Sequence, residues 1–151
     1  MATFIGSADP DSLSGGAEDD SISGREGNDT LIGLTGDDTL VGGAGDDNLD
    51  GGDGFDLASY ATALAAVNVN LGVAAAQATG GGGSDTLLSI EALEGGTFND
   101  TLSGNGAVNL LDGLGGNDTL AGSLGSDSYM FGPGDGADSI QESGTSDLDL
   151  A

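Results

Sequence analysis

Residues 24–50 read GREGNDTLI GLTGDDTLV GGAGDDNLD, three nine-residue words that nearly superimpose. Glycine opens each word and returns at the fourth place, aspartate holds the sixth place, and leucine holds the eighth. A fixed period of this kind is typical of repeat architectures, in which each unit is stable only against its neighbours. The way these units stack therefore decides the fold.

The nine-residue unit extends well beyond this stretch. It runs without a gap over residues 6–59 and again over 95–130, and the segments 80–88 and 133–141 fit it separately. The eighth places are apolar, which predicts a buried position once per unit. The sixth places are Asp11, Asp20, Asp29, Asp38, Asp47, Asp56, Asp85, Asp100, Asn109, Asp118, Asp127 and Asp138.

Each unit divides into a turn and a strand. Turn-forming residues fill the first six places, and the last three, such as TLI at 30–32, predict a short strand. Two units make one flattened coil, and coils stacked about 4.8 Å apart pair their strands into parallel sheets. We therefore predict an all-β fold, a right-handed parallel β-roll of two short-stranded sheets with the eighth-place side chains as a narrow core between them.

This stacking would place sixth-place aspartates from units 18 residues apart above one another. The chain has 26 acidic residues, one basic residue (Arg25) and no histidine, for a formal charge of −25. Carboxylates about 5 Å apart repel by about 3 kcal/mol at an effective dielectric of 20. Calcium supplies the missing charge, since it accepts six to eight oxygens in irregular geometry, whereas zinc and copper prefer nitrogen or sulfur. The sixth-place residues are thus candidate Ca²⁺ ligands, for roughly 5–8 ions.

A simpler reading is that these aspartates only form turns through local hydrogen bonds, but that reading gives no nine-residue period.

Composition excludes other functions. A chain this acidic is a poor partner for nucleic acid or anionic membranes, and no apolar run reaches the ~20 residues of a membrane-spanning helix. Histidine, cysteine and lysine are absent, so we expect no enzyme. The opening MATFIGSADP is unlike a secretory signal peptide.

The unit G-G-x-G-x-D-x-U-x, with U apolar, resembles the nonapeptide of the RTX (repeats-in-toxin, haemolysin-type) calcium-binding family. GGAGDDNLD and GGDGFDLAS, residues 42–59, match its fixed positions apart from the small Ala58. The resemblance implies export by type I secretion and calcium-driven folding outside the cell, secreted or at the cell surface. It also implies carbonyl ligands from first- and third-place residues. These are Gly24, Glu26, Gly33, Thr35, Gly42, Ala44, Gly51, Asp53, Gly95, Thr97, Gly113 and Gly115.

Some units depart from that pattern. Asp9, Glu18, Phe98 and Ala107 replace the fourth-place glycine, and Asn109 is neutral at a ligand position. The first two departures predict an N-terminal coil that is strained or poor in ions. The best-matching ligand positions are Asp29, Asp38, Asp47 and Asp56, followed by Asp118 and Asp127.

We expect residues 1–151 to form one β-roll, with a first block at 6–59, spacer rungs at 60–94, a second block and cap at 95–141, and a loose tail at 142–151. In the spacer, Val67, Val69 and Leu71 alternate with asparagines and predict a strand, whereas the alanine-rich part fits either a short helix or a wider strand. Two functions stay open. One is a calcium-triggered folding module beside a catalytic or adhesive domain of a larger exported protein; the other is a calcium-dependent adhesive or polysaccharide-binding module.

Overall fold

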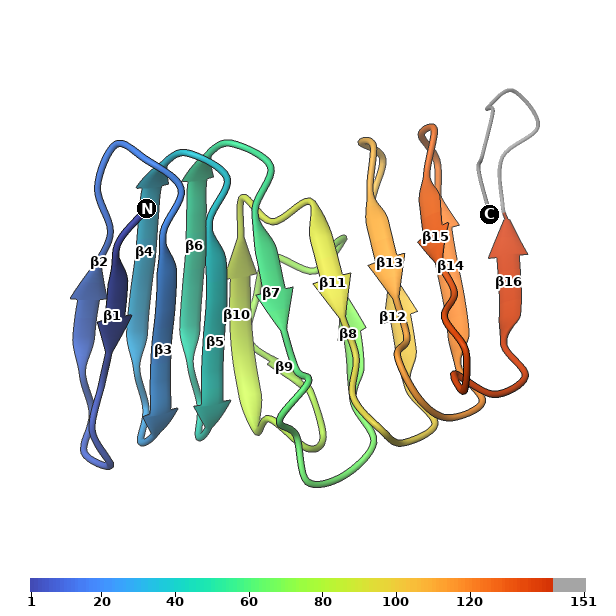
Figure 1. Ribbon diagram of the computed structural model, residues 1–151, viewed down its shortest axis with the longest axis horizontal. Helices are drawn as coiled ribbons and strands as arrows, with labels where there is room; N and C mark the ends of the chain where they lie inside the picture. The colour runs from blue at the N-terminus through green and yellow to red at the C-terminus, as the bar shows by residue number, and fades with distance from the viewer. Residues whose placement is uncertain (143–151) are drawn as a thin grey trace.

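The computed structural model describes residues 1–142, and every regular element within them is a β-strand (Figure 1). Residues 143–151, most of the predicted tail, lie outside the described residues, and Glu142 ends the last strand. The strands are β1 (Thr3–Ile5), β2 (Ser12–Ser14), β3 (Ser21–Glu26), β4 (Thr30–Thr35), β5 (Thr39–Ala44), β6 (Asn48–Asp53), β7 (Leu57–Ser59), β8 (Asn68–Asn70), β9 (Gln77–Ala78), β10 (Ser84–Leu88), β11 (Ala92–Glu94), β12 (Thr101–Ser103), β13 (Leu110–Asp112), β14 (Thr119–Ser123), β15 (Ser128–Met130) and β16 (Ser139–Glu142).

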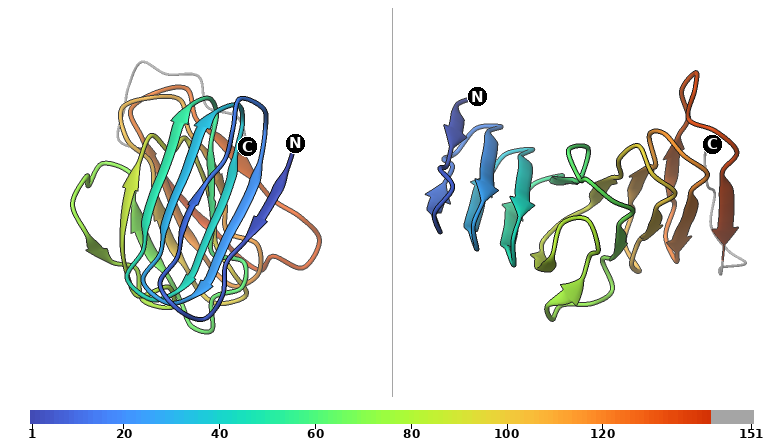
Figure 2. Two further views of the ribbon diagram at one scale, coloured as in Figure 1. Left: turned by 90° about the vertical axis from the view of Figure 1, so that its left-hand side faces the viewer. Right: turned by 90° about the horizontal axis from the view of Figure 1, so that it is seen from below.

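The strands form a flattened roll with two faces (Figure 2). One face is a 7-stranded sheet in the order β1-β3-β5-β7-β11-β13-β15, which runs the length of the described chain. The other face is divided between a 5-stranded sheet, β2-β4-β6-β10-β9, and a 4-stranded sheet, β16-β14-β12-β8. The predicted all-β parallel β-roll is therefore confirmed, with one of its two faces broken into two sheets. The pair β9–β10 is antiparallel, which the repeat did not predict.

The register follows the repeat. Ser21 of β3 pairs with Thr39 of β5, and Thr30 of β4 pairs with Asn48 of β6, so each unit stacks on the unit two places away, as predicted. Across the spacer the pairing continues, because β7 pairs with β11 and β6 pairs with β10. The spacer therefore contributes strands to the stack, because β8 also pairs with β12, and the stack of coils goes on through it.

The eighth-place side chains form the core. Ile22, Leu31 and Leu40 have no exposed surface, and the same row continues through the second block to Leu120. Burying each such side chain stabilises the fold by about 1.5–3 kcal/mol. The row is only one residue wide on each face, so much of the remaining interior consists of turns and the polar groups they carry.

The spacer confirms one expectation and corrects another. The predicted strand around Val69 is β8, whereas the alanine-rich part forms no helix; its regular structure is only the two-residue β9. A helix of so few residues is marginal without a packed face. The Gln77 side chain instead closes the loop by bonding both backbone groups of Asn70. Nothing in residues 1–142 amounts to a helical membrane span.

Candidate metal centre

The sixth-place side chains lie inside the turns at the edges of the roll. Most sit two residues before a buried eighth-place residue, and alternate residues of an extended chain point the same way, so both side chains point inward. The exceptions are at the two ends, where Leu13 is partly buried and Ile140 is exposed. Asp11 and Asp138 are partly buried. The other ten predicted positions are at most 4% exposed.

One carboxylate oxygen of most sixth-place residues holds neighbouring coils together. The backbone N–H of Asp20 donates to Oδ1 of Asp38 at 2.7 Å, and the N–H of Asp38 donates to Oδ1 of Asp56 at 2.8 Å. The same bond recurs in three ladders, so the structure brings together the predicted stacks. The ladders run Asp11–Asp29–Asp47–Asp85, Asp20–Asp38–Asp56–Glu91 and Val67–Asp100–Asp118–Asp138. The second ladder continues differently, because the Asn109 side-chain amide donates to the Glu91 backbone carbonyl, and the Asn109 N–H then donates to Oδ1 of Asp127.

The second oxygen sorts the turns into two kinds. We call the turns with Gly27, Gly36, Gly45, Gly54 and Gly116 at the fourth place the open turns. In these turns the second oxygen, Oδ2, is buried and accepts no hydrogen bond. A buried, unsatisfied carboxylate oxygen costs several kcal/mol unless something positive meets it. The residues concerned are Asp29, Asp38, Asp47, Asp56 and Asp118.

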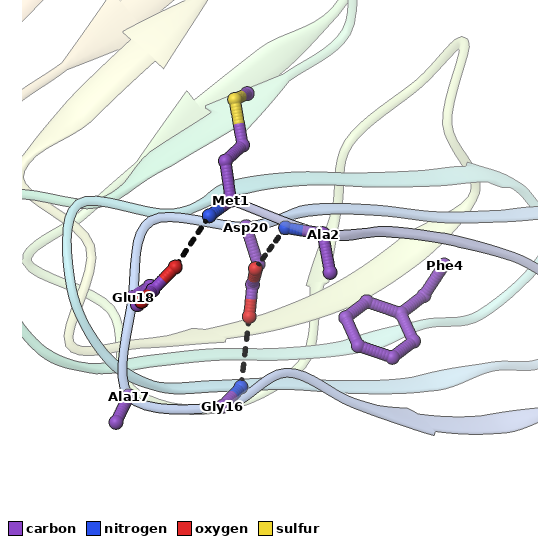
Figure 3. A pocket seen from close by; sticks show the side chains of 7 residues that line it. All are labelled: Met1, Ala2, Phe4, Gly16, Ala17, Glu18 and Asp20. Carbon is purple, nitrogen blue, oxygen red and sulfur yellow. Dashed lines mark hydrogen bonds and ion pairs between the residues drawn. The ribbon is translucent and has the colours of Figure 1, made fainter.

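We call the turns with Asp9, Glu18, Phe98 and Ala107 at the fourth place the closed turns. There the second-place N–H donates to the sixth-place side chain, at 2.8 Å from Gly16 to Asp20 and 2.6 Å from Gly96 to Asp100. Figure 3 shows Asp20 taking this bond from Gly16 and another from Ala2 of the preceding coil. The other two closed turns have the same bond, from Ser7 to Asp11 and from Asn105 to Asn109.

The backbone conformation follows the same division. In the open turns the second-place residue is left-handed, with φ of 86° at Arg25 and 85° at Leu34. Holding a residue with a side chain there costs about 1–2 kcal/mol, and such strain tends to mark functional positions. Gly27 and Gly36, at the fourth place, also have positive φ. None of the second- or fourth-place residues of the closed turns does.

Backbone carbonyls surround the unsatisfied oxygens. A Cβ added at Gly24 would lie within 3.0 Å of both Asp29 Oδ2 and the carbonyl oxygen of Gly42 in the next coil. The same holds at Gly33, with Asp38 Oδ2 and the Gly51 carbonyl. Carboxylate and carbonyl oxygens therefore face one small space, which only glycine leaves free.

The predicted carbonyl ligands divide between two situations. First-place carbonyls face the gap between coils at Gly24, Gly33, Gly42, Gly51 and Gly113. Third-place carbonyls of Ala44 and Asp53 already accept hydrogen bonds from the N–H groups of Gly27 and Gly36. Glu26 and Thr35 pair with Ala44 and Asp53 at the ends of β3 and β4, whereas Gly95 and Thr97 belong to a closed turn and Gly115 donates its N–H to the Gly96 carbonyl.

Sequence reasoning missed carbonyls at the second and fourth places. The carbonyl oxygens of Arg25 and Gly27 lie against Gly43 and Gly45 of the next coil, closer than any Cβ there would permit. Within residues 1–142, no group of three or more His, Cys, Asp or Glu side chains is positioned to hold one ion. An ion in an open turn must therefore draw most of its ligands from carbonyls, which suits a hard cation such as Ca²⁺.

Burial disfavours the charged form of the carboxylates in the open turns. Burial raises the pKa of Asp47 to about 6, and the charges of Asp85 and Asp29 add to the effect. Burial likewise raises the pKa of Asp56 to about 6, with contributions from Asp38 and Glu91. Near neutral pH these side chains are mostly charged in a place that disfavours the charge, which is the condition that a bound cation relieves.

Asp85 is an exception among the glycine-containing turns. Its Oδ2 accepts hydrogen bonds from the Tyr60 hydroxyl at 3.0 Å and the Thr79 hydroxyl at 2.8 Å. Both donors are buried and belong to the stretch around the spacer. They lie outside the nine-residue period, so no sequence signal pointed to them.

Glu91 was also missed. Its side chain accepts the Asp56 N–H at 3.0 Å and so takes a sixth-place role in the ladder. Glu91 lies nine residues before Asp100, so extending the period backwards from the second block would have found it.

At the C-terminal end, Asp127 and Asp138 accept N–H bonds from Asn109 and Asp118.

Comparison with known proteins agrees with this geometry. No curated protein is similar enough to this chain to match it. The family described as RTX calcium-binding nonapeptide repeat (4 copies) matches residues 3–31, 23–58 and 93–129, which together make up more than half of the chain. This chain therefore belongs to the RTX calcium-binding nonapeptide repeat family.

Proposed function

We propose that this chain is a module that folds by binding several Ca²⁺ ions between its stacked turns, outside the cell. One observation carries the proposal: five buried carboxylate oxygens in the open turns accept no hydrogen bond. Calcium would be held there by these oxygens together with carbonyls of the same turn and of the next coil. Bound calcium supplies positive charge that the side chains lack, since Arg25 is the one basic residue.

The energetics favour a folding switch. If free calcium is about ten times the dissociation constant, mass action stabilises the folded state by about 1.4 kcal/mol per ion. Five ions would contribute about 7 kcal/mol, comparable with the whole stability of a typical domain. Without calcium that contribution disappears while the repulsion between stacked carboxylates remains.

This dependence suits a chain that is exported unfolded. Extracellular calcium modules bind with dissociation constants of about 10⁻⁴–10⁻³ M, far above cytosolic calcium. The chain would stay unfolded inside the cell, pass through a type I secretion system, and fold outside as part of a larger exported protein. Its own role would be structural, because it has no histidine, cysteine or lysine to act as a base or nucleophile.

Calcium titration of the chelator-treated chain, followed by calorimetry and far-UV circular dichroism, tests the proposal. We expect several ions to bind together with a rise in strand signal, and magnesium at equal concentration to produce little change. A chain that is already strand-rich in chelator and unchanged by millimolar calcium would refute it.

A further inference from the structure

The two kinds of turn differ in whether their carboxylate is available to an ion. We infer that the fourth-place residue decides this, so that glycine there permits an ion and any other residue closes the turn against one. The inference rests on the proposed function and adds the location of the ions: they load at the open turns, not at the closed turns.

In a closed turn the oxygens are already in use. The second-place N–H occupies the carboxylate oxygen that an ion would need. The second-place carbonyls of Gly16 and Gly96 are occupied too, by the N–H groups of Thr35 at 3.3 Å and Gly115 at 2.9 Å from the next coil. An ion would have to break these bonds, and at Gly96 it would leave a buried N–H donor without an acceptor.

The fourth place controls the turn for two reasons. Gly45 and Gly116 have φ of 141° and 135°, a conformation that residues with a side chain rarely adopt. Space gives the second reason, because a Cβ at Gly45 or Gly54 would collide with the carbonyl of Gly27 or Gly36 in the coil before. The second place is more permissive, since Arg25 is left-handed there.

This rule distributes the ions unevenly. Four open turns follow one another in residues 24–59, and a fifth lies at 113–121. The turn at 122–130 also has glycine at its fourth place, Gly125 with φ of 132°, so the rule permits an ion there as well. Between them stand the closed turns of Asp100 and Asn109, and the two closed turns of Asp11 and Asp20 form the N-terminal end. Asp85 has glycine at its fourth place but takes no ion, because the Tyr60 and Thr79 hydroxyls fill its oxygen.

Opening a closed turn provides the test. Phe98 is 40% exposed, so F98G removes little core and restores the unit to GGTGNDTLS. F98A is the matched control, because it removes the same ring without granting left-handed freedom. Native mass spectrometry at saturating calcium should count one more ion on F98G than on the unsubstituted chain, and no additional ion on F98A.

A second pair, E18G and E18A, repeats the test in the first block and covers the case in which F98G folds poorly. If neither glycine variant gains an ion, or if the alanine variants gain one equally, the inference is overturned while calcium-driven folding stands. If the unsubstituted chain itself binds no calcium, the proposed function fails instead.

Discussion

The coils of residues 24–59 and of residues 95–112 share a fold but not a chemistry. Both stack in a parallel register and bury eighth-place leucines. In both, sixth-place aspartates accept an N–H of a neighbouring coil, whereas Asn109 accepts the N–H of Asn105 in its own turn. They differ in the other interactions of the sixth-place side chain: Asp38 Oδ2 is buried without a donor, whereas Asp100 Oδ2 accepts the Gly96 N–H. The comparison teaches that the β-roll and the ion site are separable, because a local change in the turn alters the site without altering the stack.

Removing calcium should separate the two regions most strongly. Chelation should lower the free energy of unfolding by about 7 kcal/mol if the five open turns each lose about 1.4 kcal/mol. Urea unfolding with and without chelator measures the loss, and amide hydrogen exchange should show protection lost first in residues 24–59. Equal stability with and without calcium would remove the basis of the comparison.

Neutralising one aspartate in each region should sharpen the contrast. D38N in an open turn should lose one ion and about 2–3 kcal/mol of stability, because an uncharged amide replaces a charged ligand. D100N in a closed turn should cost about 1 kcal/mol and keep the full number of ions, since its oxygen serves hydrogen bonds. Calcium counts by native mass spectrometry together with urea unfolding distinguish the two, and an identical loss of ions from both variants would count against the division.

The hydroxyls at Asp85 offer a way to convert one kind of turn into the other. Y60F removes a single buried donor and should cost about 1 kcal/mol with no change in ion number, because Thr79 still donates. Removing both donors with Y60F and T79V should leave Asp85 Oδ2 unsatisfied beside Gly83, which already has φ of 117°. The double variant should therefore gain one ion in saturating calcium. An unchanged number of bound ions would show that the two hydroxyls do not occupy the position of an ion at Asp85.

Lowering the pH should stabilise the calcium-free fold, because protonation removes part of the negative charge that calcium would otherwise balance. The gain in stability should be smaller than that from calcium. The folded-state pKa values of Asp47 and Asp56 lie at about 6, above the ordinary 3.8, so the folded state binds more protons than the unfolded state. Stability from this source is present at low pH and is lost as the pH rises through about 6. In chelator, lowering the pH from about 7 to about 6 should stabilise the fold by a few tenths of a kcal/mol per residue.

Osmolyte-induced folding in chelator measures this shift, since excluded osmolytes favour the compact state. The double variant D47N/D56N should respond less to pH than the unsubstituted chain. A metal-free fold that loses stability on acidification over this range would contradict the pKa assignments.

The regular part of the molecule follows from the sequence because one short-range rule is repeated. Glycine at the first place, aspartate at the sixth and leucine at the eighth give the turn, the ladder and the core at every copy, so the register of β3 on β5 was predictable. The state of each turn was harder to predict. The substitutions Glu18 and Phe98 were visible, but the hydrogen bond that fills the carboxylate oxygen comes from the N–H two residues earlier, whose orientation the substitution itself does not specify.

The irregular part could not be derived from the period. Tyr60 and Thr79 reach Asp85 through a loop that leaves the stack and returns, and contacts between residues 25 apart in such a loop have no repeating signal. Glu91 is different, because the period of the second block predicts its place and only its longer side chain disguised it.

The most direct test is a crystal structure of the chain grown in calcium, with the ions located by their anomalous scattering. We predict peaks beside Asp29, Asp38, Asp47, Asp56 and Asp118, and none beside Asp11, Asp20, Asp100 or Asn109. Peaks distributed equally over both kinds of turn, or open turns without an ion, would contradict the account.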